Sequence, residues 1–215
     1  MQIFLLILCA VIGYALGSVN SSVIVGRLHG VDIRTKGSKN AGLTNTLRVL
    51  GKKAALMVLA GDILKGVIAV LLGILMSGWT TAGVGGYYPV VAGTFAVIGH
   101  NWPVYFNFKG GKGILTTATV IFMLDWKIGI TVLVLFIIVV IVTKYVSLGS
   151  ILGSFAVPLV ALIFGHDLVF ILFMVLLALL AIFRHRENIK RLLSGNENKL
   201  NLGGKKGEKP ENEQV

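Results

Sequence analysis

The chain has 215 residues, of which 55% are hydrophobic and only 13% are charged, about half the charged share of an ordinary soluble domain. This composition excludes an ordinary soluble domain and, with several apolar runs near the roughly 20 residues that cross a bilayer, predicts an all-α polytopic membrane protein. The net charge of +11 lies in loops and tail, without interleaved aromatic residues. We therefore expect contacts with anionic membrane lipids and anionic substrates, and no nucleic acid as a partner.

The apolar runs predict about seven transmembrane helices. Their approximate ranges are 3–26, 54–77, 82–98, 113–124, 128–143, 147–164 and 167–183. The first run has neither a positive leading region nor a clean cleavage site, so we expect a retained helix and not a signal peptide. The run 113–124 reaches only about 17 Å as a helix. It either crosses at a tilt or forms, with the next run, a hairpin that enters and leaves on one side.

The basic residues orient these helices, because alternate crossing places nearly all of them on one face. They are Arg27, Arg34, Lys36, Lys39, Arg48, Lys52, Lys53, Lys109, Lys112, Lys144 and the basic residues from Arg184 onward. The opposite face receives only Lys127. Because Lys and Arg in short loops mark the cytoplasm, we expect the N-terminus outside and the C-terminus in the cytoplasm. Residues 1–195 would form one integral membrane domain, and residues 196–215 a polar, disordered cytoplasmic tail.

The first basic loop is crowded with hydrogen-bond donors. They belong to Ser38, Asn40, Thr44, Asn45 and Arg48. These groups suit phosphate oxygens, and the guanidinium of Arg48 suits them bidentately. The same residue types also cap helices, and Arg48 fits an ordinary cytoplasmic-face cation, so both interpretations stay open from the loop alone.

The second polar stretch is Gly110-Gly111-Lys112-Gly113. Successive glycines allow backbone N–H groups to converge on an anion, and the run opens a helix, whose first amides favour negative charge. Lys112 adds a full positive charge. The spacing is not that of a Walker A loop. A glycine cluster between membrane helices can also be a simple turn, and this alternative stays open.

The remaining two stretches place polar side chains at the ends of predicted spans. Ser147 is either a helix cap or a nucleophile. His185 is a candidate general base, a phosphate donor when protonated, or a plain interfacial residue. Glu187 and Asn188 follow it on the same turn, where Glu187 would orient a neighbouring cation.

Two charges fall inside a predicted span. Asp62 and Lys65 are three residues apart and share one helix face, so we expect an ion pair, which is either purely structural or a support for the site. The sequence contains no metal-ligand cluster, dinucleotide fingerprint or G-x-S-x-G elbow. We therefore expect no metal and no cofactor.

Taken together, these stretches resemble the bacterial acyl-phosphate:glycerol-3-phosphate acyltransferase family. The matching segments are Gly17-Ser18, 30–34, 37–45, 48–53, 62–66, Gly99-His100, 108–113, 145–148 and 185–189. The ordered set covers roughly residues 3–195. The chain departs from the usual residues of the family at Lys39, Leu43, Ile114, Leu115 and Gly149.

The resemblance implies a small enzyme of the bacterial cell (inner) membrane with its active site at the cytoplasmic face. It would transfer a fatty acyl group from acyl phosphate to the 1-hydroxyl of glycerol 3-phosphate, giving 1-acyl-glycerol 3-phosphate (lysophosphatidate) and phosphate. This is the first step of phospholipid synthesis and uses no acyl-CoA, acyl-carrier protein or metal. An upstream enzyme that forms acyl phosphate would be a partner.

On this interpretation the site divides into two sets of residues. The catalytic set is Ser38, Arg48, Ser147 and His185. The substrate- and phosphate-binding set is Asn40, Thr44, Asn45, Gly110, Gly111, Lys112, Gly113, Glu187 and Asn188. The base is either His185 or a phosphate oxygen of the substrate. The alternative function, a membrane transporter of organic phosphates, would place polar residues near the bilayer midplane, where only Asp62 and Lys65 qualify. A structural subunit that binds lipid would leave the clustered Ser, Asn, Thr and Gly unexplained.

Overall fold

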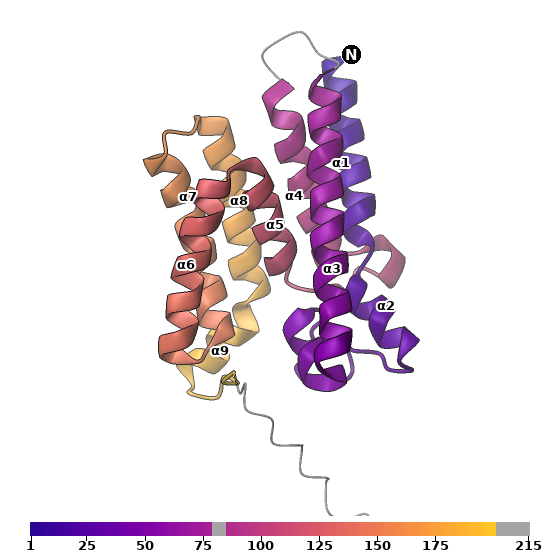
Figure 1. Cartoon of the computed structure of the whole chain (residues 1–215), viewed down its shortest axis with the longest axis vertical. Helices are drawn as coiled ribbons and strands as arrows, with labels where there is room; N and C mark the ends of the chain where they lie inside the picture. Colours follow the sequence, from indigo (N-terminus) through magenta and orange to yellow (C-terminus); the bar gives the residue numbers. More distant parts are fainter. Residues whose placement is uncertain (79–84, 201–215) are drawn as a thin grey trace, which may run out of the picture.

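The computed structural model describes residues 1–78 and 85–200, and within these ranges the chain is helical, with no β-strand (Figure 1). The helices are α1 (Gln2–Ser18), α2 (Ser21–Leu28), α3 (Leu43–Ser77), α4 (Tyr88–Asn101), α5 (Ile114–Leu124), α6 (Trp126–Thr143), α7 (Val146–Ile163), α8 (Leu168–Arg184) and α9 (Arg186–Leu193). Two 3-10 turns, η1 (Gly85–Tyr87) and η2 (Val104–Phe106), flank α4. The predicted all-α class is confirmed for the described residues.

A helix lies at each of the seven predicted apolar runs, although residues 82–84 of the third run fall outside the described part of the chain. Four helical stretches are long and apolar enough to cross a bilayer, or five if α8 and α9, which meet at 58°, count as one. They are Gln2–Leu28, Leu43–Ser77, Trp126–Thr143, Val146–Ile163 and the α8–α9 pair. α4 and α5 have 14 and 11 residues, fewer than the roughly 20 that span the hydrocarbon.

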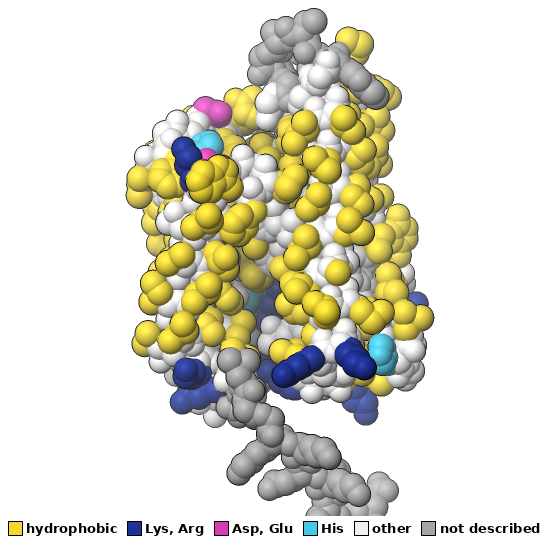
Figure 2. Space-filling view, viewed as in Figure 1, with side chains coloured by type: hydrophobic (Ala, Val, Ile, Leu, Met, Phe, Trp, Pro, Cys, Tyr) yellow, Lys and Arg dark blue, Asp and Glu magenta, His cyan; other side chains and the backbone are white. Residues whose placement is uncertain are grey.

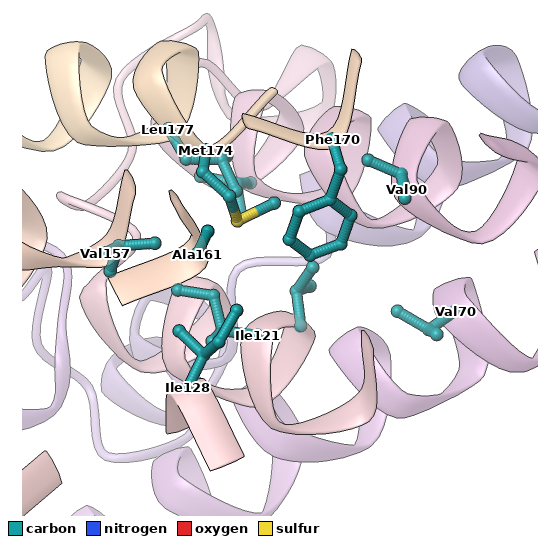
Figure 3. Close-up of a cluster of buried hydrophobic side chains, with 11 residues drawn as sticks. Val70, Val90, Ile121, Ile128, Val157, Ala161, Phe170, Met174 and Leu177 are labelled. Carbon is teal, nitrogen blue, oxygen red and sulfur yellow. The ribbon is translucent and has the colours of Figure 1, made fainter. Parts of the chain in front are cut away.

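The helices form two groups. In Figure 1, α1, α3 and α4 lie together on one side, α6, α7 and α8 lie on the other, and α5 is placed between them. An apolar core joins the groups (Figure 3). There, Phe170 and Met174 of α8 lie with Ile121 of α5, Val70 of α3 and Val90 of α4. Three smaller apolar clusters lie outside this core, and many other large apolar side chains are exposed, as expected for helices that face lipid.

The predicted first span, 3–26, is not one continuous helix. α1 ends at Ser18, and the side-chain oxygen of Asn20 caps α2 by accepting a backbone N–H three residues further on, at 3.1 Å. The ammonium of Lys65 donates to the carbonyl of Val19 at 3.1 Å. The interruption is stable because a cap and a buried cation satisfy backbone groups that would otherwise lack partners.

α1 and α4 approach each other with almost no side chain between them. A Cβ at Gly13 would lie 3.0 Å from the carbonyl carbon of Ala92, and a Cβ at Gly17 would lie 2.6 Å from the Cα of Ala96. Small residues are the usual means by which membrane helices bring their backbones together, because van der Waals contact replaces the hydrophobic effect there. The Gly17-Ser18 motif therefore contributes to packing, apart from any chemistry.

α3 begins earlier than the predicted start at residue 54. It runs from Leu43 and is interrupted at Gly51, whose φ of 84° and ψ of −173° are not helical. A residue with a Cβ adopts this positive φ only with strain. Thr44, Asn45 and Arg48, predicted on a loop, therefore lie on a short helical segment whose direction differs from that of the rest of α3.

Candidate active site

Lys and Arg side chains gather at one end of the molecule, the lower end in Figure 2, while hydrophobic side chains cover much of the face above them. Contacts bring three predicted polar stretches together at this end. Arg34 from the α2–α3 loop reaches the carbonyl of Phe106 at 3.2 Å, and Lys112 from the glycine run reaches Asn188 of α9. The predicted convergence of these distant stretches is therefore present in the fold.

A single buried amide holds the α2–α3 loop. The side-chain oxygen of Asn45 accepts the backbone N–H of Ser38 at 2.8 Å. The side-chain nitrogen of Asn45 lies within hydrogen-bond distance of the carbonyls of Ile33 (3.0 Å), Lys36 (3.1 Å) and Asn40 (3.1 Å). Asn45 was predicted to bind phosphate, but the structure commits its amide to the loop that presents Ser38.

Arg34, which is paired with Asp32, ties the same loop to the segment before the glycine run. Arg34 donates to both carboxylate oxygens of Asp32, at 2.9 and 2.8 Å, and also to the carbonyl of Phe106. The hydrogen bond from Arg34 is the main reason why the pKa of Asp32 is lowered to about 2. The carboxylate therefore stays charged, and the loop keeps its tie, throughout the physiological range of pH.

The glycine run is held by a cation that the sequence analysis did not single out. Arg184 of α8 donates to the carbonyl of Gly110 at 3.1 Å and to that of Gly111 at 2.8 Å, and its guanidinium lies 5.4 Å from the centre of the Trp102 ring. The N–H of Gly111 donates to the carbonyl of His100 at 3.2 Å. The amide of Gly111 therefore already has a partner within the protein. It is not among the glycine amides that could converge on an anion, as the sequence predicted for this run.

Three polar side chains donate to one carboxylate at the basic end, and a fourth contacts one of these three. The Lys112 ammonium donates to the side-chain oxygen of Asn188, and the Asn188 side-chain nitrogen donates to the carboxylate of Glu197 at 2.7 Å. The Ser147 hydroxyl donates to the same carboxylate oxygen at 2.8 Å. Arg191 donates to the other oxygen at 2.7 Å. The predicted residues Lys112, Ser147 and Asn188 thus lie in one cluster, together with two residues that the sequence analysis missed.

His185 lies buried at the junction of α8 and α9. Its Nδ1 is 2.8 Å from the carbonyl of Ala181. A carbonyl can only accept, so Nδ1 carries the hydrogen and Nε2 of the neutral ring has a free lone pair. Burial, followed by the positive charge of Lys112, lowers the pKa of His185 to about 4. The ring is therefore neutral at pH 7 in the absence of substrate.

Positive charge is in surplus around Lys112. Burial is the main cause that lowers the pKa of Lys112 to about 8, and the charges of Arg191, Arg184 and Arg48 lower it further. The carboxylate of Glu197 acts in the opposite direction. Four cations close enough to interact, with one carboxylate among them, make an electrostatic environment that favours anions.

Of the other predicted residues, Ser38, Thr44 and Arg48 are exposed at this end of the molecule. Glu187, predicted to support the site beside Asn188, is also exposed. Its carboxylate lies 3.4 Å from Lys190 on the same helix face. The supporting role of Glu187 stays a prediction, and the carboxylate that contacts Asn188 is that of Glu197.

The chain reaches Glu197 through a sharp reversal. α9 ends at Leu193, Gly195 has a φ of +72°, and the N–H of Asn196 donates back to the carbonyl of Arg191 at 2.8 Å. Further on, the N–H of Leu200 donates to the carbonyl of Lys144 at 2.7 Å. The predicted start of the tail at residue 196 therefore falls inside a segment that contacts the site. The Ser194-Gly195 stop signal after an amphipathic helix was the sequence feature that could have indicated this return.

A pocket of about 470 Å³ opens beside the glycine run. Its lining residues are Asp32, Arg34, Thr35, Lys39, Phe108, Lys109, Gly110 and Arg184. The volume is within the range of small-molecule sites, and Lys and Arg predominate among the charged groups of the lining. A small anionic ester fits both the size and the charge of this pocket.

A second polar cluster lies inside the helices. The ammonium of Lys65 is 2.9 Å from the carboxylate of Asp62, and their side chains are 5% and 1% exposed. The Ser21 hydroxyl donates to Asp62 at 2.9 Å, and Nδ1 of His100 is 2.8 Å from the Lys65 ammonium. The predicted ion pair is confirmed, and it also supports the interruption between α1 and α2.

Within residues 1–78 and 85–200, no group of three or more His, Cys, Asp or Glu side chains is placed to hold a metal ion. The expectation of a metal-free reaction remains a prediction. What the basic end offers is hydroxyl, amide, ammonium and guanidinium groups in fixed positions. Such groups bind anions, orient them and stabilise the negative charge that develops in a transition state.

Comparisons with known proteins agree with this geometry. The model of a family described as glycerol-3-phosphate acyltransferase matches residues 7–195. A relative of that name from Thermoanaerobacter sp. (strain X514) is 48% identical over 195 residues, covering 90% of this chain and 95% of the relative. Another from Bacillus subtilis (strain 168) is 41% identical over 197 residues, covering 91% and 98%.

Two solved structures are also similar. The crystal structure of PlsY (YgiH), an integral membrane glycerol 3-phosphate acyltransferase, in its glycerol 3-phosphate form has a TM-score of 0.82 at 34% identity. The match covers 93% of this chain and 96% of that chain. The lysophosphatidic acid form of PlsY has a TM-score of 0.81 at 33% identity, with 91% and 95% covered.

Proposed function

We propose an acyl donor and a mechanism for this chain, which belongs to the glycerol-3-phosphate acyltransferase family and is an integral membrane enzyme of that class. The enzyme transfers a fatty acyl group from acyl phosphate to the 1-hydroxyl of glycerol 3-phosphate. The products are 1-acyl-glycerol 3-phosphate (lysophosphatidate) and inorganic phosphate, and the reaction is the first step of phospholipid synthesis. The observation that carries this proposal is the surplus of positive charge around Lys112.

Both substrates of this reaction carry a phosphate group, and their mutual repulsion must be offset before they react. Lys112, Arg48 and Arg184 supply positive charge for this purpose, and hydroxyl and amide groups supply directed hydrogen bonds. At short range in a partly buried site, such charges act more strongly than in water. Acyl phosphate brings its own good leaving group, so we expect no metal or other cofactor.

The predicted residues have distinct roles in this mechanism. Ser38, Arg48 and Lys112 bind substrate phosphates. Ser147 and His185 hold the acyl phosphate or the glycerol 3-phosphate, and Asn188 supports them. The pocket beside the glycine run is the route by which the water-soluble substrate arrives, because Lys and Arg predominate among its charged groups. The acyl chain of the other substrate lies in the bilayer beside the exposed apolar helices.

The chemical step forms one bond and breaks one. The 1-hydroxyl oxygen attacks the acyl carbonyl carbon, and the bond from that carbon to the phosphate oxygen breaks, so phosphate leaves with the electron pair. The hydroxyl proton passes either to Nε2 of His185 or to a phosphate oxygen. The pKa of His185 is about 4 without substrate, and two bound anions would raise it toward the useful range. A His185→Ala variant with a near-wild-type rate would eliminate His185 as the base.

The enzyme crosses the bacterial inner membrane seven times, with its N-terminus outside and its active site on the cytoplasmic face. Support comes from the concentration of Lys and Arg at the end that carries Lys112 (Figure 2), because such residues mark the cytoplasmic side. α4 and α5 would complete their crossings with the η1, η2 and glycine-run segments beside them. Lipid headgroups would contact the same basic end, and an upstream enzyme that forms acyl phosphate would supply the donor.

Single-cysteine labelling tests this orientation. In a Cys9→Ser background, Lys127→Cys and Lys52→Cys place one thiol at each end, both at exposed positions. Intact cells with a permeabilised outer envelope would be treated with a membrane-impermeant maleimide. We expect labelling of Lys127→Cys before lysis and of Lys52→Cys only after lysis. The reverse pattern would overturn the orientation without affecting the reaction.

The reaction itself is tested by phosphate release. Purified protein in lipid is given palmitoyl phosphate with and without glycerol 3-phosphate, and lysophosphatidate is measured in parallel. We expect phosphate release that depends on glycerol 3-phosphate and equals lysophosphatidate formation, and Lys127→Met should match the wild type. Turnover with palmitoyl-CoA alone would replace the proposed donor. Absence of turnover with both donors would overturn the proposed mechanism.

A further inference from the structure

The segment after α9 places one carboxylate inside the proposed active site. Gly195 reverses the chain, and the side chain of Glu197 is only 6% exposed although it follows a surface helix. The backbone of Leu200 is fixed by its hydrogen bond to Lys144 at 2.7 Å, and the ammonium of Lys199 lies over the Tyr145 ring at 5.7 Å. Glu197 is therefore anchored on both sides along the chain.

Glu197 decides which way the Asn188 amide points. The side-chain nitrogen of Asn188 donates to the carboxylate at 2.7 Å, and its oxygen accepts from the Lys112 ammonium. A carboxylate can only accept and an ammonium can only donate. A flipped amide would place its nitrogen against Lys112 and its oxygen against Glu197, so this orientation alone satisfies all three groups.

Glu197 also fixes the hydroxyl of Ser147. That hydroxyl donates to the carboxylate at 2.8 Å, and its hydrogen is therefore directed at Glu197, leaving its lone pairs for other partners. Arg191 holds the second carboxylate oxygen at 2.7 Å, which prevents the carboxylate from rotating. One side chain thus sets the direction of groups from the glycine run, the α6–α7 junction and α9.

We propose that Glu197 is a positioning residue of the acyltransferase, which orients Asn188 and Ser147 so that Lys112 is presented to a substrate phosphate. The inference rests on the proposed function, since it assumes that Lys112 binds a phosphate in the reaction. Glu197 itself touches neither substrate nor reacting atoms. It belongs to the active site all the same, because displacement of a catalytic group by about 1 Å can lower a rate by about 100-fold.

A different role for the same carboxylate is to occupy a phosphate position until substrate displaces it. Two observations favour positioning. Both carboxylate oxygens of Glu197 are engaged, one by Asn188 and Ser147 and the other by Arg191, so displacement would break three hydrogen bonds. Glu197 is also the carboxylate that offsets the charges of Lys112 and Arg191, and its departure would leave those cations unmatched.

Three variants separate these roles. Glu197→Ala removes both acceptor oxygens, and we expect kcat to fall by about 100-fold with a smaller change in KM. Glu197→Gln keeps one oxygen for Asn188 and Ser147, so we expect it to retain kcat within about tenfold of the wild type. Asn198→Ala, an exposed neighbour whose side chain makes no hydrogen bond within the described residues, should match the wild type.

The pH profile supplies a readout that a merely structural role would not change. The charged and titratable groups around Lys112 are Glu197 and Arg191 on the α9 side, Arg184 and His185 at the end of α8, and Arg48 on α3. Of the groups that act on the pKa of Lys112, only Glu197 raises it. Glu197→Gln should therefore move the alkaline limb of kcat/KM to lower pH, and Asn198→Ala should leave it in place.

The wild type and all three variants are assayed with both palmitoyl phosphate and palmitoyl-CoA, and each variant is scored relative to the wild type with the active donor. If only palmitoyl-CoA supports turnover, the proposed acyl donor is overturned. The activity of each variant relative to the wild type can still be measured with palmitoyl-CoA. Glu197→Ala with kcat within threefold of the wild type would overturn the positioning role. A lower KM with unchanged kcat in Glu197→Ala would also overturn it, because that result is expected if Glu197 occupies a phosphate position. The positioning role would be overturned too if Glu197→Gln lost as much kcat as Glu197→Ala and its alkaline limb did not move.

Discussion

Around Asp62, inside the helices, each charged group meets a complementary partner, whereas around Lys112 positive charge is in surplus. Asp62 and Lys65 are 2.9 Å apart and nearly unexposed. Ser21, the carbonyl of Val19 and Nδ1 of His100 are their further hydrogen-bond partners. Lys112 interacts with Arg48 and two further arginines, and a single carboxylate offsets them. The two clusters use similar residues for opposite purposes.

Structural and functional charges in a membrane protein can be told apart by whether they are neutralised locally. A buried charge without a partner is costly, so a cluster that serves only the fold is neutralised from within. A cluster that must accept anionic substrates keeps its surplus where water and substrate can reach it. The predictions below test this distinction, beginning with the largest expected effect.

Replacing Asp62 with Ala should have the largest effect on stability. It leaves the Lys65 ammonium buried without its carboxylate, and we expect a loss of about 3–5 kcal/mol in the free energy of unfolding. Thermal unfolding of purified protein in detergent would measure this loss. The double variant Asp62→Leu/Lys65→Met should recover at least half of the lost stability, because it removes both charges together. Equal instability of the single and double variants would contradict internal neutralisation.

Replacing Lys112 with Met should abolish most activity with little change in stability. We expect kcat/KM to fall by at least about 100-fold, because an ammonium that stabilises substrate charge is lost. The midpoint of thermal unfolding should change little, since removal of one cation relieves repulsion with its neighbours. The matched control is Lys127→Met at the other end, an exposed position. A large loss of stability in Lys112→Met would show that Lys112 serves the fold and not substrate binding alone.

Activity should decrease as pH rises through the pKa of Lys112. Burial lowers that pKa to about 8, so the ammonium is charged below pH 8 and becomes neutral above it. We expect kcat/KM, which reports the free enzyme, to fall about tenfold per pH unit above this value. A Lys112→Arg variant stays charged and should lose this alkaline limb if it retains activity. An identical limb in Lys112→Arg would assign the titration to another group.

The smallest effect is expected at the end remote from the site. His166 and Asp125 are 2.8 Å apart, and their side chains are 25% and 17% exposed. A pair of this kind stabilises a fold by about 1 kcal/mol or less, so His166→Gln should shift the unfolding midpoint only slightly and leave kcat unchanged. A measurable change in kcat would show that the two ends are coupled.

The apolar runs predicted the helices well, because a span of hydrocarbon demands a long apolar segment. Lys112, Ser147 and Asn188 could also be found, since polar groups between such segments are conspicuous and the ordered set resembles one family. The interruption at Asn20 was missed for the converse reason. A hydropathy average over the run hides one capping residue, and the cation that stabilises the break, Lys65, lies 46 residues from Val19.

Hydrogen bonds that depend on tertiary structure could not be predicted in the same way. The amide of Asn45 suits a phosphate and the carboxylate of Glu187 suits a cation beside one. The loop conformation commits Asn45 to backbone groups, and the helix face turns Glu187 to solvent. Glu197 stands in a polar segment whose composition resembles a tail. Its proposed role depends on a chain reversal at Gly195 and on three donors from two helices, α7 and α9.

The close contact between α1 and α4 has a consequence for how the protein is made. α1 ends at Ser18 and α4 begins at Tyr88, an interval of about 70 residues, which takes on the order of 10 s to synthesise at about 5–20 residues per second. During this interval Gly13 and Gly17 have no partner backbone and face lipid or another protein of the insertion machinery. α1 is therefore inserted before its packing partner has been synthesised, and it pairs with α4 only after α4 has entered the membrane.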